Sequence, residues 1–434
     1  MAARRFRLVL LLAVLTALGG VFWATRRPSP ASEQLALGKR LAAAGKKIEA
    51  FDAFAAAADA TPDDESVWTA ATEAAEAAHG LVAADALAVN FLDRHPESKA
   101  LRSVRGGLYE KAGLSLLEQG RAADGFAALR TAVRIAPSRA LAQRTLGELL
   151  FENGFHRRAA AHLEAAVSTN PSDARAWHDL GRLRSAADIP AAIAAFETAV
   201  HLAPDNALAR LDLAAILRTG NRLGDSETRY REALKIAPED PVILTQVGGF
   251  LATTGADPKR RTEAEYLLEK ATRLDPRAGD AYAFLGKLAF ERGDRIKART
   301  LLEKALVCPL DDAQSVWYTL SRACFATGDT LRGREALNRG TVLREERFAL
   351  ARAVELAFED PTNPEKRIAV ARLYARQEDY VKAISQYRGA LILAPDKTLA
   401  RHELDQLTAR LTREGKMPSM ALYEAMVATD KEKS

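Results

Sequence analysis

Prolines recur along most of this chain at intervals of 33 or 34 residues, and this period restricts the fold more than any other feature of the sequence. A proline cannot continue a helix, because it lacks a backbone N–H and its ring clashes with the preceding turn. Regular prolines therefore predict regular helix ends, and a repeat of roughly 34 residues accommodates one pair of helices. The prolines of this series are Pro62, Pro96, Pro137, Pro171, Pro204, Pro238, Pro276, Pro309 and Pro395.

Small and large apolar residues recur in phase with these prolines. When each proline is counted as position 32 of a repeat, Gly or Ala occupies positions 8, 20 and 27, and large apolar residues occupy positions 7 and 24. In one repeat the small residues are Gly147, Ala159 and Ala166, and the large ones are Leu146 and Leu163. Helices approach to about 8 Å only where the side chains at their crossing are small. The pattern predicts antiparallel helix pairs.

A glycine near the middle of most repeats separates the two expected helices. Glycine readily adopts the left-handed backbone of a helix C-cap, which ends the first helix before the second begins. One helix pair cannot bury its own apolar face, so we expect consecutive pairs to stack into an α-solenoid. The glycines at this position are Gly45, Gly120, Gly154, Gly255, Gly293 and Gly328.

This pattern resembles the tetratricopeptide repeat family. The resemblance covers about residues 31 to 414 and implies an all-α fold, a right-handed superhelix of about nine to ten stacked antiparallel helix pairs. Its concave groove is then expected to bind protein partners. The best match lies in residues 174 to 204, with Trp177, Leu180, Gly181, Ala192, Phe196, Ala199 and Pro204.

The chain is expected to divide into six parts. Residues 1–27 form a signal anchor or signal peptide, 28–34 a linker, 35–328 the repeat array, 329–360 a long irregular helix that interrupts the array, 361–414 a final pair and a capping helix, and 415–434 a C-terminal tail. Between Pro96 and Pro137 we expect a first helix lengthened by about two turns. A basic loop is expected at residues 257–261.

The N-terminal segment carries a targeting pattern. An uncharged apolar run, residues 8–24, follows the basic start MAARRFR, which is typical of an export signal or a signal anchor. The basic start predicts a single-pass membrane protein whose N-terminus stays in the cytoplasm and whose repeats lie on the exported, periplasmic or extracytoplasmic, side. The alternative is cleavage after Gly19, which would give a secreted protein.

Charge and cysteine content exclude several classes of function. The net charge is +5 against 62 basic and 57 acidic side chains, interleaved along the chain, so nucleic-acid binding is not indicated. Only two cysteines, Cys308 and Cys324, are present, and they cannot form a disulfide framework or a paired-cysteine zinc site. We expect no cofactor, no metal and no small-molecule substrate.

The resemblance also implies which side chains line the groove, because the first helix of each repeat faces it in this family. Cations predominate at those positions. Arginine forms bidentate bonds with carboxylates, and aromatic rings supply rigid contact area, so an acidic peptide segment is a suitable partner. An ordinary solvated inner surface is the alternative. The candidate groove residues are Arg144, His178, Arg182, Arg218, Lys287, Phe290, Tyr318, Arg322, Arg372 and Arg376.

No catalytic signature accompanies the repeats. His156 and His162 are six residues apart and lie on different helix faces, so they cannot share a metal ion. The segment 224–227, Gly-Asp-Ser-Glu, fits a turn in which Asp or Ser caps the following helix. We therefore expect a non-catalytic, membrane-tethered scaffold with no catalytic residues. The alternative, by analogy of fold, is an assembly or carrier component of machinery for envelope polysaccharide synthesis or export.

Overall fold

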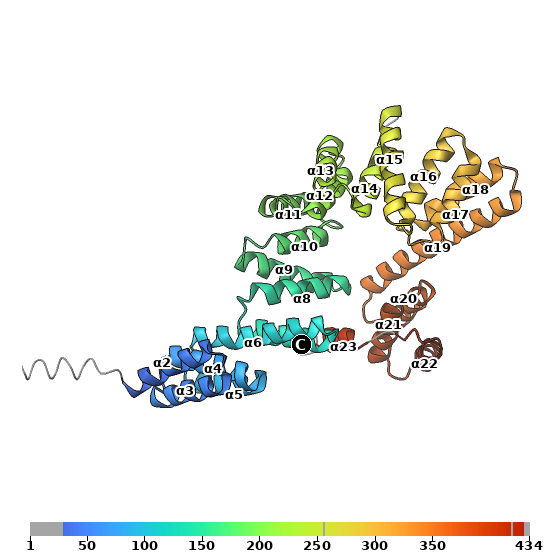
Figure 1. The fold of residues 1–434 in the computed structure, drawn as a ribbon. Coiled ribbons are helices and arrows are strands. Elements are labelled where there is room, and N and C mark those ends of the chain that lie inside the picture. Colours follow the sequence, from blue (N-terminus) through green and yellow to red (C-terminus); the bar gives the residue numbers. More distant parts are fainter. Residues whose placement is uncertain (1–28, 255–256, 418–419, 429–434) are drawn as a thin grey trace, which may run out of the picture. The chain divides into compact units, whose positions relative to one another are not determined.

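The computed structural model describes residues 29–254, 257–417 and 420–428 of the chain. The elements in these ranges are the helices α2 to α23, and none of the residues described there forms a strand (Figure 1). The all-α prediction is confirmed for this part of the chain. The expected signal segment, residues 1–27, and the predicted C-cap Gly255 lie outside the described residues.

The chain forms two compact units, which we describe separately. Of the described residues, the first unit contains those from 29 to 171 together with 425–428, and the second contains those between 172 and 424. The expected six-part organisation has no boundary at Pro171, because the repeat pattern continues through it. The short helix α23 (Ala421–Ala428) lies within the segment that was expected to be a tail.

Four helix pairs build the first unit, and the two helices of each pair pack on one another. Its core holds Phe54, Trp68, Phe91 and Leu101, surrounded by alanines. The pairs are α2 (Pro30–Ala43) with α3 (Lys47–Ala60), α4 (Glu65–His79) with α5 (Leu81–Arg94), α6 (Lys99–Glu118) with α7 (Ala122–Ile135), and α8 (Ala140–Glu152) with α9 (His156–Thr169).

The second unit contains six further pairs, followed by α22 (Thr398–Arg413), which packs on the last of them. The pairs are α10 (Ala174–Arg184) with α11 (Ile189–Leu202), α12 (Ala207–Thr219) with α13 (Leu223–Ile236), α14 (Pro241–Thr253) with α15 (Pro258–Leu274), α16 (Gly279–Arg292) with α17 (Arg295–Ala305), α18 (Ala313–Ala326) with α19 (Thr330–Glu359), and α20 (Pro364–Arg376) with α21 (Tyr380–Leu393).

Glycine occurs at the helix crossings for the predicted steric reason. A Cβ added to Gly147 would lie 2.6 Å from Cγ of Leu163, and one added to Gly286 would lie 2.7 Å from Cγ of Leu302. Atoms at these distances overlap, so only glycine allows the two helices of each pair to come this close. The pairing of a small residue with a large one across each hairpin is confirmed at these sites.

The predicted turn glycines also have the expected backbone. Gly45, Gly154 and Gly293 have φ angles of 74°, 81° and 97°, in the left-handed region. In two repeats a side-chain-bearing residue takes this conformation instead, because Asn221 and Glu378 both have a φ angle of 59°. Glycine at this position is therefore a preference and not a requirement.

Capping residues that follow the prolines start the first helix of several pairs. Asp173 accepts hydrogen bonds from the backbone N–H groups of Arg175 and Ala176, each at 3.1 Å. Asn206 accepts one from Ala209 at 3.0 Å. These bonds satisfy donors that have no partner inside the helix.

The structure differs from the predicted linker at residues 28–34. Residues 30–34 belong to α2, because Pro30 occupies the first helical position, where its missing N–H costs no hydrogen bond. The side chain of Ser29 caps the helix by accepting from the N–H of Ser32 at 3.2 Å. The Pro-Ser composition that predicted a linker is therefore a helix start.

The two longest helices of the described residues are α6 and α19, whereas most helices have 13 to 15 residues. α6 has 20 residues, in agreement with the lengthening predicted between Pro96 and Pro137. α19 has 30 residues and occupies the place of the long helix expected at residues 329–360, as one continuous α-helix. The prediction of a basic loop at residues 257–261 is wrong from Pro258 onward. Asp257 caps α15, and the basic residues that follow lie in the first turn of this helix.

Candidate binding site

The ten predicted groove residues do not lie in one site. Arg144 belongs to the first unit, and the other nine belong to the second. Their surroundings separate them into three groups. Three of them line a cavity, others are held in ion pairs or ring contacts within the chain, and two are exposed without an ion pair in the described residues.

The cavity lies between α16, α18 and α19 and has a volume of about 370 Å³. We call it the cationic cavity. It brings together Lys287, Tyr318 and Arg322 of the predicted set. Its lining residues are Lys287, Asp312, Gln314, Ser315, Tyr318, Thr319, Arg322 and Arg347.

The geometry of α18 explains why its residues share this wall. Residues 315, 318, 319 and 322 follow the i, i+3, i+4, i+7 spacing of one helix face. The opposite face is anchored in the core by Val316, Leu320 and Cys324, which are all buried. Asp312 starts the helix by accepting from the N–H of Ser315 at 3.2 Å.

A glycine in α19 allows the neighbouring helix to approach the tyrosine of the cavity. A Cβ added to Gly340 would lie 3.2 Å from Cε1 of Tyr318, which is closer than ordinary van der Waals contact. The ring of Tyr318 therefore packs against the backbone of α19. This packing holds the tyrosine in place between the two helices.

Positive charge predominates around the cavity. Three cations, Lys287, Arg322 and Arg347, face a single lining carboxylate, Asp312. In the described part of the chain, none of these three cations forms a hydrogen bond or an ion pair. Arg322 makes a ring contact, with its Cζ 4.7 Å from the centroid of Phe290.

Acidic side chains lie beside Asp312 at one edge. Burial, together with the nearby negative charges of Asp311 and Asp312, raises the pKa of Asp280 above its usual range, although the backbone N–H of Asp311 donates to it. The cavity thus has a cationic wall and an acidic edge. An anionic ligand would be oriented toward the arginines.

Two buried polar atoms at the cavity are without a hydrogen-bond partner among the described residues. They are the hydroxyl of Tyr318 and Oε1 of Gln314. A buried polar atom left unpaired costs about 1–3 kcal/mol, so both sites gain from a ligand or from ordered water. One can donate and the other can accept, which suits a polar ligand.

Phe290 is not an open aromatic surface. It is only 9% exposed, and the guanidinium of Arg295 lies 4.2 Å from its centroid in addition to that of Arg322. Cations over an aromatic ring are attracted to its negative face. The ring therefore positions Arg322 and is covered by these side chains.

His178 is part of an acidic cluster. Its Nε2 lies 2.8 Å from Oδ2 of Asp212, and its Nδ1 lies 3.8 Å from Oδ1 of Asp179, which Arg182 also approaches at 3.8 Å. Burial alone would lower the pKa of His178, but the hydrogen bonds and charges of the two carboxylates outweigh it and raise the pKa to about 9. The imidazole is therefore charged at neutral pH.

Other predicted arginines are engaged with glutamates of the same chain. Arg372 forms a bidentate pair with Glu403, at 2.9 and 2.6 Å, and the hydroxyl of Tyr387 donates to the same carboxylate at 2.9 Å. Arg144 donates to Glu148 one turn along α8. Arg218 and Arg376 are exposed and have no ion pair within the residues that the structure describes.

Five of the eight residues that line the cavity were missed from the sequence, namely Asp312, Gln314, Ser315, Thr319 and Arg347. Arg347 lies in the long helix, where no proline fixes the register, so the repeat pattern assigns it no face. Gln314 precedes the groove positions by one residue. A helical projection of residues 330–359 could have placed Arg347, because it lies seven residues after Gly340 and so on nearly the same face.

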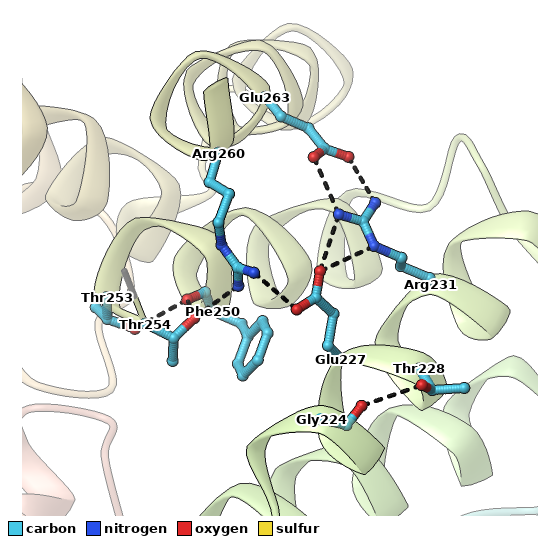
Figure 2. Close-up of polar contacts among 9 residues, drawn as sticks. All are labelled: Gly224, Glu227, Thr228, Arg231, Phe250, Thr253, Thr254, Arg260 and Glu263. Atoms are coloured by element: carbon cyan, nitrogen blue, oxygen red, sulfur yellow. Dashed lines mark hydrogen bonds and ion pairs between the residues drawn. The ribbon is translucent and has the colours of Figure 1, made fainter. Parts of the chain in front are cut away.

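The basic residues at the start of α15 join a network between neighbouring pairs (Figure 2). Arg231 binds Glu263 at 2.9 Å and Glu227 at 3.0 Å, and Arg260 binds Glu227 at 2.8 Å. Burial would raise the pKa of Glu227, but the two guanidinium groups outweigh it and lower the pKa. Arg260 is therefore occupied within the chain.

The serine of the segment 224–227 has a structural role that differs from the predicted cap. α13 begins at Leu223, so Ser226 lies inside the helix and not before it. Its side chain is fully buried and donates to the carbonyl of Ala214 at 2.7 Å. Ser226 thus ties α13 to α12 and is inaccessible as a nucleophile.

Among the described residues, no group of histidine, cysteine, aspartate and glutamate is placed to bind a metal ion. No helix in the described ranges has the length and hydropathy needed to cross a membrane.

Comparison with known proteins agrees with the stacked helix pairs. Sequence models described as "Tetratricopeptide repeat" match residues 116–183 and 182–241. The chain is a tetratricopeptide repeat protein. Tetratricopeptide repeats support a role as a protein-interaction scaffold.

Two curated relatives share a part of the tetratricopeptide repeats. The protein O-mannosyl-transferase TMTC3 of Homo sapiens and that of Mus musculus are each 24% identical over 172 residues, which is 36% of this chain and 18% of theirs. The match thus spans less than one fifth of the relatives' length.

Several solved structures are similar at low identity. YrrB, described as a protein with an unusual peptide-binding site, is 20% identical, with 48% of this chain and 96% of that chain covered and a TM-score of 0.35. The human IFIT1 dimer with PPP-AAAA is 14% identical, with 86% and 92% covered and a TM-score of 0.42.

Proposed function

We propose that this tetratricopeptide repeat protein is a non-catalytic scaffold that binds an acidic segment of a partner protein at the cationic cavity. The observation that carries the proposal is the set of three cations, Lys287, Arg322 and Arg347, which face the cavity without an ion pair in the described residues. Elsewhere in the second unit, arginines such as Arg372 are paired with carboxylates of the chain.

The polar groups of the cavity support a carboxylate ligand. Arginine side chains bind carboxylates in a bidentate geometry, as Arg372 binds Glu403 in this chain. The hydroxyl of Tyr318 is a further donor without a partner. A carboxylate that enters the cavity would therefore gain charge-assisted bonds and would satisfy a buried donor.

The size of the cavity supports recognition of a short segment. A volume of about 370 Å³ lies at the lower end of ligand sites and accommodates one or two side chains. The rest of a bound peptide would lie on the neighbouring surface. Specificity would then come from one or two acidic side chains at a fixed place in the peptide.

Peptide binding to the full-length protein in detergent tests this proposal. A fluorescent peptide rich in Asp and Glu should bind, and the same peptide with Asn and Gln should not. Arg347→Ala and Lys287→Ala should each weaken binding about tenfold, which corresponds to about 1.4 kcal/mol. Arg376→Ala is the matched control, since Arg376 is also exposed but lies outside the cavity. Equal affinity of wild type and Arg347→Ala would refute the site.

Salt dependence provides a second readout. Ion pairs at an open cavity are screened, so affinity for the acidic peptide should fall as the salt concentration rises from about 0.05 to 0.5 M. The loss should be smaller in Arg347→Ala, because that variant has one cation fewer. An affinity that does not depend on salt would favour apolar contacts instead.

We also propose that residues 8–24 tether the repeats to a membrane, with the repeats on the exported side. The uncharged run and the basic residues before it support this topology. A reporter that is active only after export, fused behind Ser434, should be active. Resistance of the protein to extraction at high pH distinguishes a retained anchor from a secreted product, whose N-terminus would begin after Gly19.

A role in envelope polysaccharide assembly or transport is the second candidate. Glycan recognition would use aromatic faces such as Phe290, Tyr318 and Phe325. The structure gives this candidate less support, since Phe290 is covered by two arginines and Tyr318 packs on α19. Only Phe325 is well exposed, at 41%. Binding of the peptide but not of glycans would favour the scaffold.

A further inference from the structure

The second half of α19, residues 344–359, has an outward face that nothing in the second unit covers. Phe348 is 64% exposed and Phe358 is 86% exposed, which is unusual for large aromatic side chains. The inward face of the same segment is half-buried, at residues 343, 346, 350, 353 and 357. One face of this helical segment therefore packs on the rest of the second unit, and the opposite face is exposed to solvent.

The exposed residues form a regular stripe. Arg344, Phe348, Ala351, Glu355 and Phe358 are separated by four, three, four and three residues, and all five are exposed. At 100° per residue they fall within about 80° of one another. Alternating spacings of four and three are the pattern of a helix that packs along another helix.

The charged side chains of this segment have no ion pair in the part of the chain that the structure describes. Arg344, Glu345, Glu346, Arg347, Arg352, Glu355 and Glu359 form no ion pair with any described residue. The first half of α19 is different, since Arg332 lies 2.7 Å from Glu335 and 3.8 Å from Glu303. Unpaired charges of both signs on an exposed face with two phenylalanines indicate that the face meets a charged partner.

The charges and side-chain sizes along the stripe favour another molecule of the same sequence as that partner. We propose that the outward face of α19 pairs with the same face of a second copy of the chain, as an antiparallel two-helix contact. In one register, Arg344 lies opposite the partner's Glu355, and Phe348 lies opposite the partner's Ala351. The same register places Phe358 opposite the partner's Thr341.

Each layer of this register is complementary. Within the stripe, Arg344 meets a glutamate and each phenylalanine meets a small side chain, so neither like charges nor two large rings collide along it. Shifting the second helix by one heptad places Phe348 against the partner's Phe358 and Ala351 against the partner's Glu355. A parallel arrangement would align Arg344 with itself. Of the three arrangements, the first antiparallel register therefore gives the best match of charge and side-chain size along the stripe.

The contact is isologous, because the same residues are used by both copies. The Arg344–Glu355 pair occurs twice in the dimer, and a twofold axis near residues 349 and 350 relates the two pairs. A charge reversal at either position therefore replaces two attractive pairs by two repulsive ones. Reversal at both positions restores two attractive pairs with the signs exchanged.

Sedimentation of the full-length protein in detergent micelles tests the proposal. Wild type should be in a monomer–dimer equilibrium at concentrations from about 1 to 100 µM, the range expected for a small contact. Arg344→Glu and Glu355→Arg should each raise the dissociation constant at least tenfold. The double variant should return it to within about threefold of wild type.

Glu197→Arg is the control, because Glu197 is exposed on α11 and also lacks an ion pair in the described residues. This variant should leave the equilibrium unchanged. A wild type that is monomeric across the whole range would overturn the proposal. So would a dimer that both single reversals leave intact. Retained helix content by circular dichroism excludes unfolding as the cause of dissociation.

Discussion

Nε2 of His178 on α10 lies 2.8 Å from a carboxylate oxygen of Asp212 on α12, the first helix of the next pair. This contact joins two consecutive repeats through a charged hydrogen bond. The side chain of His178 is only 17% exposed, so the bond is largely shielded from solvent. It makes the stability of this part of the second unit dependent on protonation.

We expect the second unit to lose stability in alkaline solution. The pKa of His178 is raised from 6.5 to about 9 in the folded protein, so the folded state binds the proton more tightly than the unfolded state. The contribution is complete below about pH 6.5 and disappears as the pH rises through about 9. We expect a loss of about 1–2 kcal/mol, after allowing for solvent screening.

Urea denaturation at a series of pH values from 6 to 10 measures this effect. His178→Gln should reduce the slope of stability against pH, and Asp212→Asn should reduce it as well, because it removes the partner that retains the proton. A wild type whose midpoint is constant between pH 6.5 and 9.5 would contradict the assignment.

The network around Glu227 should show energetic coupling. Glu227 receives bonds from Arg231 and Arg260, and Glu263 receives a second pair of bonds from Arg231. Glu227→Gln should cost about 1 kcal/mol, since the groups are partly exposed. A double-mutant cycle between Glu227→Gln and Arg260→Gln, measured by urea denaturation, should give a coupling of about 0.5–1 kcal/mol. Strictly additive effects would show that the bonds are not formed in solution.

Glycine at a helix crossing should be intolerant of even one methyl group. Gly147→Ala should destabilise the first unit by about 1–3 kcal/mol, because the added Cβ would lie 2.6 Å from Leu163. Gly224→Ala is the matched control, as Gly224 is also helical but has no atom within 4 Å of an added Cβ. This control should stabilise α13 by about 0.5–1 kcal/mol through helix propensity. Thermal melting of the two variants should therefore shift in opposite directions.

Removing the hydroxyl of Tyr318 should weaken peptide binding without lowering the stability of the free protein. Tyr318→Phe keeps the ring that packs on α19 and deletes a buried donor that lacks a partner in the described residues. We expect equal or greater stability of the free protein, by up to about 1 kcal/mol, and weaker binding of the acidic peptide. A variant that loses stability would mean that the hydroxyl is satisfied by water in the free protein.

The repeating features of the fold were predictable because each depends on residues close in sequence. The prolines, the crossing glycines and the turn glycines act within one helix hairpin, so their spacing alone identifies it. The start of α2 was missed because the Pro- and Ser-rich segment was interpreted as a linker, although a proline is tolerated in the first turn of a helix.

The candidate site was less predictable, because it depends on which charges already have partners. Arg144 and Arg372 occupy groove positions, yet each is paired with a glutamate of the chain. The pair of Arg144 and Glu148 follows from their spacing of four residues, but Arg372 and Glu403 are 31 residues apart. Arg347 was outside the repeat register, so its position at the cavity required the structure.

Polar bonds between neighbouring helix pairs recur at separations of about one repeat. Lys270 reaches the carbonyl of Pro238, 32 residues earlier, and Arg260 reaches Glu227, 33 residues earlier. Repeats connected only to their neighbours respond to pulling force one at a time, beginning where a repeat has a neighbour on one side only. Stretching the second unit would therefore release chain in increments of about 34 residues, roughly 120 Å of extended polypeptide. A scaffold built in this way can lengthen under tension without losing all of its repeats at once.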